Sequence, residues 1–151
     1  MIIKSLENLN SLSIKIGKNI TPSDCIMLYG EIGTGKTTFT RNLINYLQKK
    51  EKINLTNVPS PTFNLLYEYE IKDLKILHYD LYRLKNTKDI IQLGIFKEEI
   101  PCVKVIEWPE LIKEDIQDRL ELKFDYLKDD NQRNIDINGF GKWKNFKIDE
   151  L

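Results

Sequence analysis

Apolar residues recur at helical spacing in two segments of the chain, and each segment is therefore predicted to be a helix. In the first segment, residues 5–18, Ser5 stands where an N-cap residue is needed. Its apolar positions are Leu6, Leu9, Leu12 and Ile16. In the second, residues 30–49, the same spacing follows a glycine-rich loop. Its apolar positions are Phe39, Leu43, Tyr46 and Leu47.

Two continuous apolar runs of strand length predict buried strands. They are residues 25–29 and 102–106. Between them, residues 87–100 have the pattern of a short helix, broken near Gly94 and ended by Pro101. Residues 111–115 are predicted to form one helical turn.

Imperfect alternation of apolar and polar residues marks two further pairs of strands. Residues 63–71 and 74–79 flank a turn at Lys72 and Asp73, which predicts a β-hairpin. Residues 120–126 and 134–138 flank a polar turn at 128–131, which predicts antiparallel strands at an edge of the sheet. We detect no repeat or low-complexity segment, and 151 residues fit one domain spanning 1–151.

The glycine-rich loop between the first buried run and the second helix fits the pattern G-x-x-x-x-G-K-T. Such a loop points its backbone N–H groups at a polyphosphate, at the positive end of the following helix. The residues expected at the phosphates are Glu31, Ile32, Gly33, Thr34, Gly35, Lys36, Thr37 and Thr38. Lys36 is expected to be exposed in the empty loop and to reach the β- and γ-phosphates, and Thr37 to ligate Mg²⁺. The alternative is a glycine-rich turn without a ligand.

A bound triphosphate also needs a carboxylate near the metal and a group that positions water or an acceptor. Glu107 ends the second buried run, Asp80 follows the hairpin, and Thr62 lies in a loop stiffened by two prolines. We therefore treat Glu107 and Asp80 as candidate metal-side and catalytic residues, and Thr62 as a candidate sensor of the γ-phosphate. The alternatives are a solvated strand end for Glu107, a turn residue or a partner of Arg83 for Asp80, and a plain connector for Thr62.

Three further kinds of residue carry weaker signals. His78 is the only histidine, and alternation places it on the same face as Asp80, which would let it orient that carboxylate. A purely structural histidine is the alternative. Trp108 is a candidate to stack on a base or a partner, with core packing as the alternative. Arginines, among them Arg133, meet phosphates in some proteins but more often form surface ion pairs.

Composition narrows the classes of function. The chain has 23 basic and 23 acidic residues, which argues against strong unaided binding to nucleic acid. Cys25 and Cys102 lie in apolar runs and are predicted to be buried thiols in a reducing compartment. The sequence shows neither a membrane span nor a signal-peptide apolar region, so we expect a cytoplasmic protein without membrane contact.

Four segments together resemble the TsaE (YjeE) family, the ATPase of bacterial threonylcarbamoyladenosine synthesis on tRNA. They are residues 28–41 (LYGEIGTGKTTFTR), 60–69 (SPTFNLLYEY), 78–84 (HYDLYRL) and 105–110 (VIEWPE). The phosphate loop is common to many families, whereas the other three at these spacings are much more specific. The resemblance implies an α/β phosphate-loop fold of three layers. It also implies a mixed, mainly parallel sheet with the predicted hairpin and edge strands.

The resemblance also implies function. ATP would bind with Mg²⁺ and be hydrolysed slowly, with dependence on a complex with the TsaD and TsaB proteins. TsaD transfers the threonylcarbamoyl group to tRNA, TsaE is thought to reset the complex, and tRNA would be met only through that complex. By motif, Lys36 and Thr37 would hold phosphate and metal, and Asp80 and Glu107 would serve the metal and water.

The resemblance also implies that Thr62 and Trp108 lie near the nucleotide. Leu9 stands where the family commonly has a threonine near the base, so base contacts are the part of the site that the motifs define least. In the C-terminal third, Arg133 is the one residue that suggests nucleotide contact.

Two other functions remain open. A small-molecule kinase shares the phosphate loop but usually has an arginine-rich lid, and no such segment occurs here. A nucleotide-sensing adaptor would bind ATP without turnover, and the sequence separates it poorly from a slow ATPase. A GTPase is disfavoured, because no Asn-Lys-x-Asp guanine motif occurs.

Overall fold

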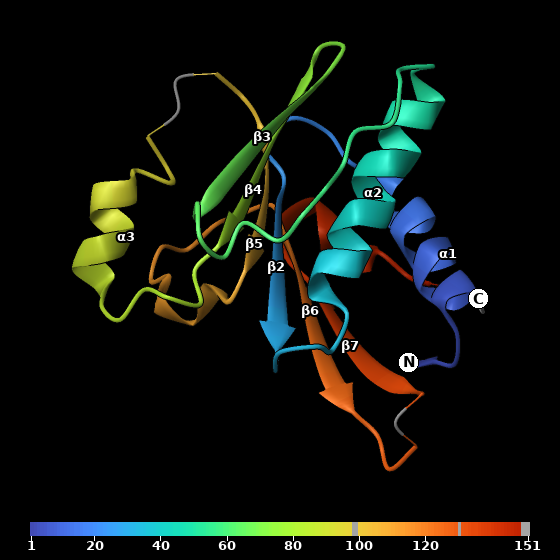
Figure 1. Ribbon diagram of the computed structural model, residues 1–151. Helices are drawn as coiled ribbons and strands as arrows, with labels where there is room; N and C mark the ends of the chain where they lie inside the picture. The colour runs from blue at the N-terminus through green and yellow to red at the C-terminus, as the bar shows by residue number, and fades with distance from the viewer. Residues whose placement is uncertain (98–99, 130, 149–151) are drawn as a thin grey trace.

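The computed structural model describes residues 1–97, 100–129 and 131–148, and its centre is one seven-stranded sheet (Figure 1). In spatial order the strands are β1 (Ile2–Ile3), β7 (Arg133–Gly139), β6 (Arg119–Tyr126), β2 (Cys25–Gly30), β5 (Val103–Glu107), β4 (Leu74–Asp80) and β3 (Leu66–Ile71). The continuous apolar runs form β2 and β5, as predicted, and β2 is the middle strand. Cys25, Ile26, Met27 and Leu28 of β2 are buried, and they belong to two apolar cores on the two faces of the sheet.

The middle of the sheet is parallel and its flanks are antiparallel. β2 pairs in parallel with β5 on one side and β6 on the other, and β4 pairs in parallel with β5. The β3–β4 hairpin and the β6–β7 pair are antiparallel, as predicted. The structure adds that β6 lies against β2, while β1 covers the outer side of β7. Parallel pairing brings the carboxyl ends of β2, β4 and β5 to one edge of the sheet.

Helices cover both faces of the sheet, which gives the three predicted layers. α1 (Leu6–Gly17) and α2 (Lys36–Lys50) lie on one side and α3 (Thr87–Leu93) on the other (Figure 1). Successive residues of β2 alternate between the two cores: Ile26 packs with the α1 and α2 residues, and Met27 packs with the α3 residues. Two 3₁₀ helices complete the described elements, η1 (Pro109–Leu111) and η2 (Gly141–Asn145).

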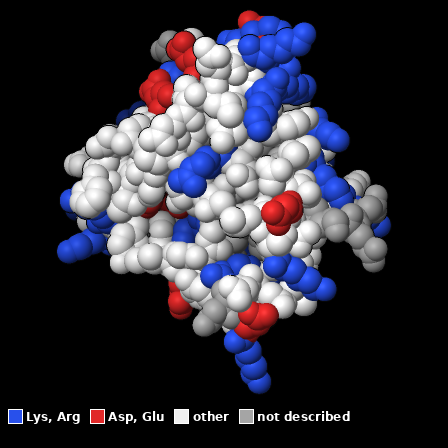
Figure 2. All heavy atoms as spheres, turned by 45° about the vertical axis from the view of Figure 1, so that its right-hand side comes forward, with Lys and Arg blue, Asp and Glu red and all other residues white. Residues whose placement is uncertain are grey.

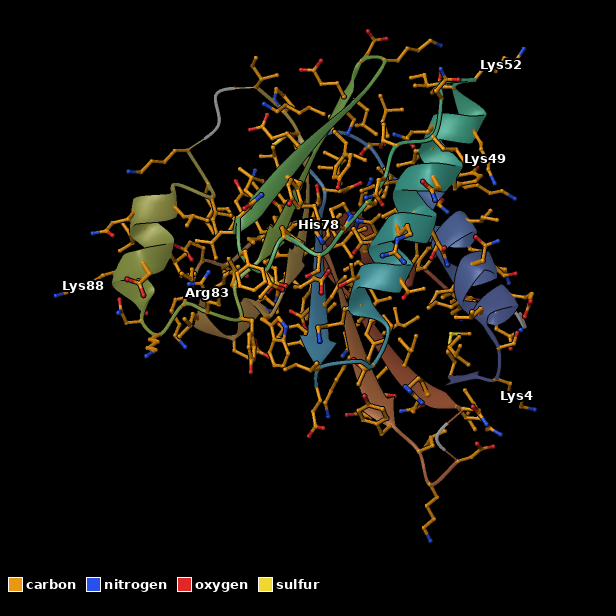
Figure 3. The ribbon with its side chains drawn as sticks, viewed as in Figure 1. Lys4, Lys49, Lys52, His78, Arg83 and Lys88 are labelled. Carbon is orange, nitrogen blue, oxygen red and sulfur yellow. The ribbon has the colours of Figure 1, made fainter. Side chains whose placement is uncertain are left out.

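The ends of the helices follow from local chemistry. The Ser5 hydroxyl accepts a hydrogen bond from the Asn8 N–H at 3.2 Å, which confirms the predicted N-cap of α1. Basic side chains gather at the C-terminal end of α2, where Lys49 and Lys52 lie, as the helix dipole favours (Figures 2 and 3). The glycine-rich loop is at the opposite end of α2, so these lysines lie about 20 Å from it.

α3 ends at Leu93, because Gly94 adopts a left-handed φ of 66° and turns the chain, which confirms the predicted break near Gly94. Residues 94–97 are not helical, contrary to the predicted range of 87–100, of which residues 98–99 lie outside the described range. Two other predicted boundaries were wrong. The helical turn predicted at 111–115 lies at Pro109–Leu111, where the proline starts it. β3 begins at Leu66 instead of residue 63, because the preceding residues form a turn.

Both cysteines are buried free thiols, as predicted, with exposed fractions of 1% for Cys25 and 2% for Cys102. Burial raises the pKa of Cys25 to about 12, so this thiol is unreactive at neutral pH. Among the helices of the described residues, none has the length and apolar character that crossing a bilayer requires.

Candidate functional site

The glycine-rich loop, Asp80 and Glu107 meet at the carboxyl edge of the parallel strands. Leu28 pairs with Glu107, and Glu107 pairs with Asp80, so neighbouring strands present these groups at the same level. They border a cleft of about 190 Å³. Its lining includes ten predicted site residues: Ile32, Gly33, Gly35, Lys36, Thr37, Thr38, Thr62, Asp80, Glu107 and Trp108.

The loop backbone is held close to the sheet. Gly30 has a φ of 130°, and a Cβ there would overlap the carbonyl oxygen of Phe124 on β6. Gly35 has a φ of 113° and forms the N-cap position of α2. Both positions therefore require glycine, and the first turn of α2 faces the cleft with its N–H groups, which suits an anion.

Lys36 is buried, whereas the sequence predicted an exposed side chain. Only 4% of it is accessible, and its Nζ donates to the carbonyl oxygens of Gly30 at 2.6 Å and Glu31 at 2.8 Å. The ammonium also lies 4.1 Å from the centre of the Trp108 ring. A buried charge needs such partners, and the loop itself supplies them. Burial lowers the pKa of Lys36, against the opposing effect of Glu107 and Asp80.

Glu107 uses both carboxylate oxygens. The Thr37 hydroxyl donates to Oε2 at 3.0 Å, and His78 Nε2 lies 2.8 Å from Oε1. Glu107 is itself only 2% exposed. The alternation of faces had suggested that His78 orients Asp80. In the structure its hydrogen bond goes to Glu107 instead. The register of β4 and β5 explains this contact. His78 lies opposite Val105, so Glu107, two residues further along β5, is its diagonal neighbour.

Asp80 gathers the hydroxyls of the proline-stiffened loop. Its Oδ2 accepts hydrogen bonds from Thr62 and, at 3.0 Å, from Ser60, and its Oδ1 accepts from the Tyr82 N–H at 3.0 Å. Thr62 is therefore brought to the cleft as predicted. Ser60 also lines the cleft and was missed, although its position between Pro59 and Pro61 beside Thr62 was a usable signal.

Trp108 has an unusual backbone conformation for a large residue, with a φ of 60° and a ψ of 56°. Its ring packs at a tilt of 50° against Tyr82, at a centroid distance of 4.8 Å, and covers Lys36. A left-handed backbone at a non-glycine residue is strained and is often found at functional sites. Here it turns the indole towards the cleft.

Three predicted nucleotide contacts, Glu31, Thr34 and Arg133, are not part of the cleft lining. Thr34 is buried, and its hydroxyl donates to the Glu31 carbonyl at 2.8 Å, which closes the loop. Arg133 lies 4.3 Å from the ring centre of Tyr126, whose hydroxyl donates to the Ile32 carbonyl at 2.7 Å. Arg133 thus reaches the loop through Tyr126, a residue that sequence reasoning missed because the contact joins distant segments.

The residues at the cleft fit Mg²⁺ held together with a polyphosphate. Thr37, Glu107 and Asp80 offer hydroxyl and carboxylate oxygens, the donors that Mg²⁺ prefers. Within the described ranges, no group of three or more His, Cys, Asp or Glu side chains could hold a metal alone. Further ligands would have to come from phosphate oxygens and water, as is usual for Mg²⁺ at nucleotide sites.

Comparison with known proteins places this chain in a family. The family model described as "Threonylcarbamoyl adenosine biosynthesis protein TsaE" matches residues 3–135. The chain belongs to the TsaE family. Family membership confirms the resemblance seen in the four sequence segments.

Relatives support the same assignment to the TsaE family. A Rickettsia typhi TsaE protein is 38% identical over 89% of this chain and 88% of its own length, and a Bacillus subtilis TsaE protein is 32% identical over 86% and 78%. A Rickettsia felis TsaE protein is 37% identical over 75% of this chain, which spans only 64% of that relative. The crystal structure of Bacillus subtilis YdiB superposes with a TM-score of 0.70 at 26% identity, covering 94% of this chain and 85% of YdiB.

Proposed function

We propose that this chain is a single-domain ATPase (residues 1–151) that binds ATP with Mg²⁺ in the cleft and hydrolyses it slowly by itself. In this proposal the activity supports threonylcarbamoyladenosine formation on tRNA in the cytoplasm, as the names of its relatives suggest. The observation that carries the proposal is Glu107, a buried carboxylate at 3.0 Å from the hydroxyl of Thr37. A phosphate loop without such a carboxylate would bind a nucleotide but lack a group to position water.

Each residue has a role that its contacts support. The N–H groups of the loop and the first turn of α2 bind the phosphates, and Lys36 neutralises their charge after leaving the carbonyls of Gly30 and Glu31. Bound Mg²⁺ would neutralise charge that develops on the phosphate oxygens. Thr37 and the two carboxylates would hold this ion and its waters, and Thr62 reports on the γ-phosphate from its place beside Asp80.

Partners enter the proposal through the family. We propose that TsaD and TsaB proteins stimulate the hydrolysis and that tRNA is reached only through their complex. The net charge of zero agrees with a chain that does not bind RNA strongly by itself. A group supplied by a partner at the γ-phosphate can accelerate phosphoryl transfer by roughly 10³–10⁵.

Phosphate release tests the proposal. Purified chain is incubated with Mg²⁺ and ATP or GTP, with and without TsaB and TsaD proteins. We expect slow release from ATP alone, faster release with the partners, and less release from GTP. Nucleotide binding without any release would indicate an adaptor, and phosphate transfer to a small acceptor would indicate a kinase. Fast release by the isolated chain, or a preference for GTP, would contradict the proposal.

A further inference from the structure

We infer that His78 is a positioning residue: its Nε2–H holds Glu107 so that the second carboxylate oxygen faces Thr37. The inference rests on the proposed function of the cleft and assigns a role to a residue outside its lining. His78 lies on β4, on the face of the sheet that α2 covers (Figure 3). Its exposed fraction is 0%, so it cannot contact the nucleotide or solvent directly.

The hydrogen bonds form a short chain. His78 Nε2 lies 2.8 Å from Glu107 Oε1, and Glu107 Oε2 accepts from the Thr37 hydroxyl at 3.0 Å. An ionised carboxylate oxygen can only accept, so the shared proton belongs on Nε2 of the imidazole. With one oxygen fixed in this way, rotation of the carboxyl group about its last bond is restricted, and Oε2 stays directed at the first turn of α2.

The surroundings of His78 argue against a role in packing alone. Two of its neighbours in the sheet on this face, Ile76 and Val105, belong to the apolar core, and Tyr67 lies opposite it on β3. An aliphatic residue would fit against these side chains without a polar atom. The other ring nitrogen, Nδ1, is buried and has no hydrogen-bond partner in the described part of the chain. Leaving such an atom unpaired costs free energy. Among the described residues, the polar contact that offsets this cost is the one between Nε2 and Glu107.

Side-chain geometry provides matched variants. The amide nitrogen of glutamine is as many bonds from Cβ as Nε2 of histidine, so His78→Gln keeps a donor that reaches Glu107. The amide nitrogen of asparagine corresponds to Nδ1 and falls short, so His78→Asn keeps polarity but loses the contact. His78→Leu removes both nitrogens. A role in positioning predicts that glutamine rescues function and asparagine and leucine do not.

The test measures metal binding and turnover separately. Mn²⁺, detected by electron paramagnetic resonance as a stand-in for Mg²⁺, is titrated into the ADP complex, and kcat and KM for ATP are measured with TsaB and TsaD proteins. For His78→Asn and His78→Leu we expect Mn²⁺ affinity or kcat to fall by about 10–100-fold, with little change in KM. His78→Gln should stay near wild type. Thermal unfolding of each variant shows whether the fold is kept.

The outcomes separate the inference from the proposed function. Wild-type metal affinity and kcat in His78→Asn, or a defect in folded His78→Gln as large as in His78→Asn, would overturn the positioning role. If the wild type binds Mn²⁺ with ADP but releases no phosphate, hydrolysis is wrong while the metal affinities still decide the role of His78. If the wild type binds no Mn²⁺ with ADP, both the site and the inference are wrong.

Discussion

The residue that differs most from its sequence-based expectation is Lys36. The G-x-x-x-x-G-K-T pattern predicted its place in the loop, but not that the side chain would be buried. Its partners are two backbone carbonyls and the indole of Trp108, which reaches it through a left-handed backbone. None of these contacts leaves a signal in residue type or spacing. The pattern identifies which residue acts, whereas the burial of its side chain depends on the conformation of the loop and of Trp108.

The burial of Lys36 leads to a prediction for Lys36→Met, which keeps about the length of the side chain but removes its charge. Binding of ATP should become much weaker, because the phosphates then lose the ammonium group that neutralises part of their charge. The free energy of unfolding should change by only about 1 kcal/mol, since the lost hydrogen bonds are to neutral carbonyls beside an open cleft. Calorimetric titration with ATP and urea denaturation measure the two effects. Near-normal ATP affinity would rule out Lys36 as a phosphate ligand.

At the scale of elements, the sequence predicted both hairpins and the buried strands well, because alternation and apolar runs are local features. It could not predict contacts between distant elements. The end of β6 meets the glycine-rich loop through the Tyr126 hydroxyl, which donates to the Ile32 carbonyl, and Arg133 of β7 stacks on the same ring. A hairpin predicted only as an edge of the sheet thus supports the loop that faces the cleft.

Tyr126→Phe should therefore weaken ATP binding without disturbing the fold. Loss of one hydrogen bond of about 1 kcal/mol frees the loop and should raise the Kd about fivefold. Tyr46→Phe is the matched control, since Tyr46 packs between α1 and α2 against Gly17. Equal Kd values for Tyr126→Phe and the control would show that the contact does not order the loop. Both values come from the same calorimetric titration.

At the scale of the whole molecule, a second polar cluster lies at the opposite end of β2. Asp24, 1% exposed, accepts from the Trp143 indole N–H at 3.1 Å and pairs with the Lys142 ammonium at 2.6 Å. It joins the start of the central strand to η2. No element was predicted at η2, because the burial of Trp143 depends on a partner more than a hundred residues away.

Asp24→Ala should destabilise the fold and leave nucleotide binding unchanged. Removing the carboxylate leaves the buried indole N–H of Trp143 without this acceptor and removes the ion pair of Lys142, which keeps its hydrogen bonds to Asn19 and Thr21. We expect a loss of about 3 kcal/mol in the free energy of unfolding. Asp24→Asn keeps the acceptor for Trp143 and should lose less. Urea denaturation and ATP titration of both variants check the prediction. A large loss of ATP affinity in folded Asp24→Ala would mean that the two ends of β2 are coupled.

The central claim is that Glu107 is required for ATP hydrolysis in the cleft. The rate of ATP cleavage in a single turnover tests this claim most directly. The chain is kept in excess over ATP, and Mg²⁺ and the TsaB and TsaD proteins are present. Release of the γ-phosphate is followed for wild type, Glu107→Gln and Glu110→Gln. Glu110 is the matched control, an exposed carboxylate in the same segment. We predict that Glu107→Gln binds ATP but cleaves it at least roughly 10²-fold more slowly than wild type. Glu110→Gln should cleave ATP at the wild-type rate. Cleavage at the wild-type rate by Glu107→Gln would contradict the account.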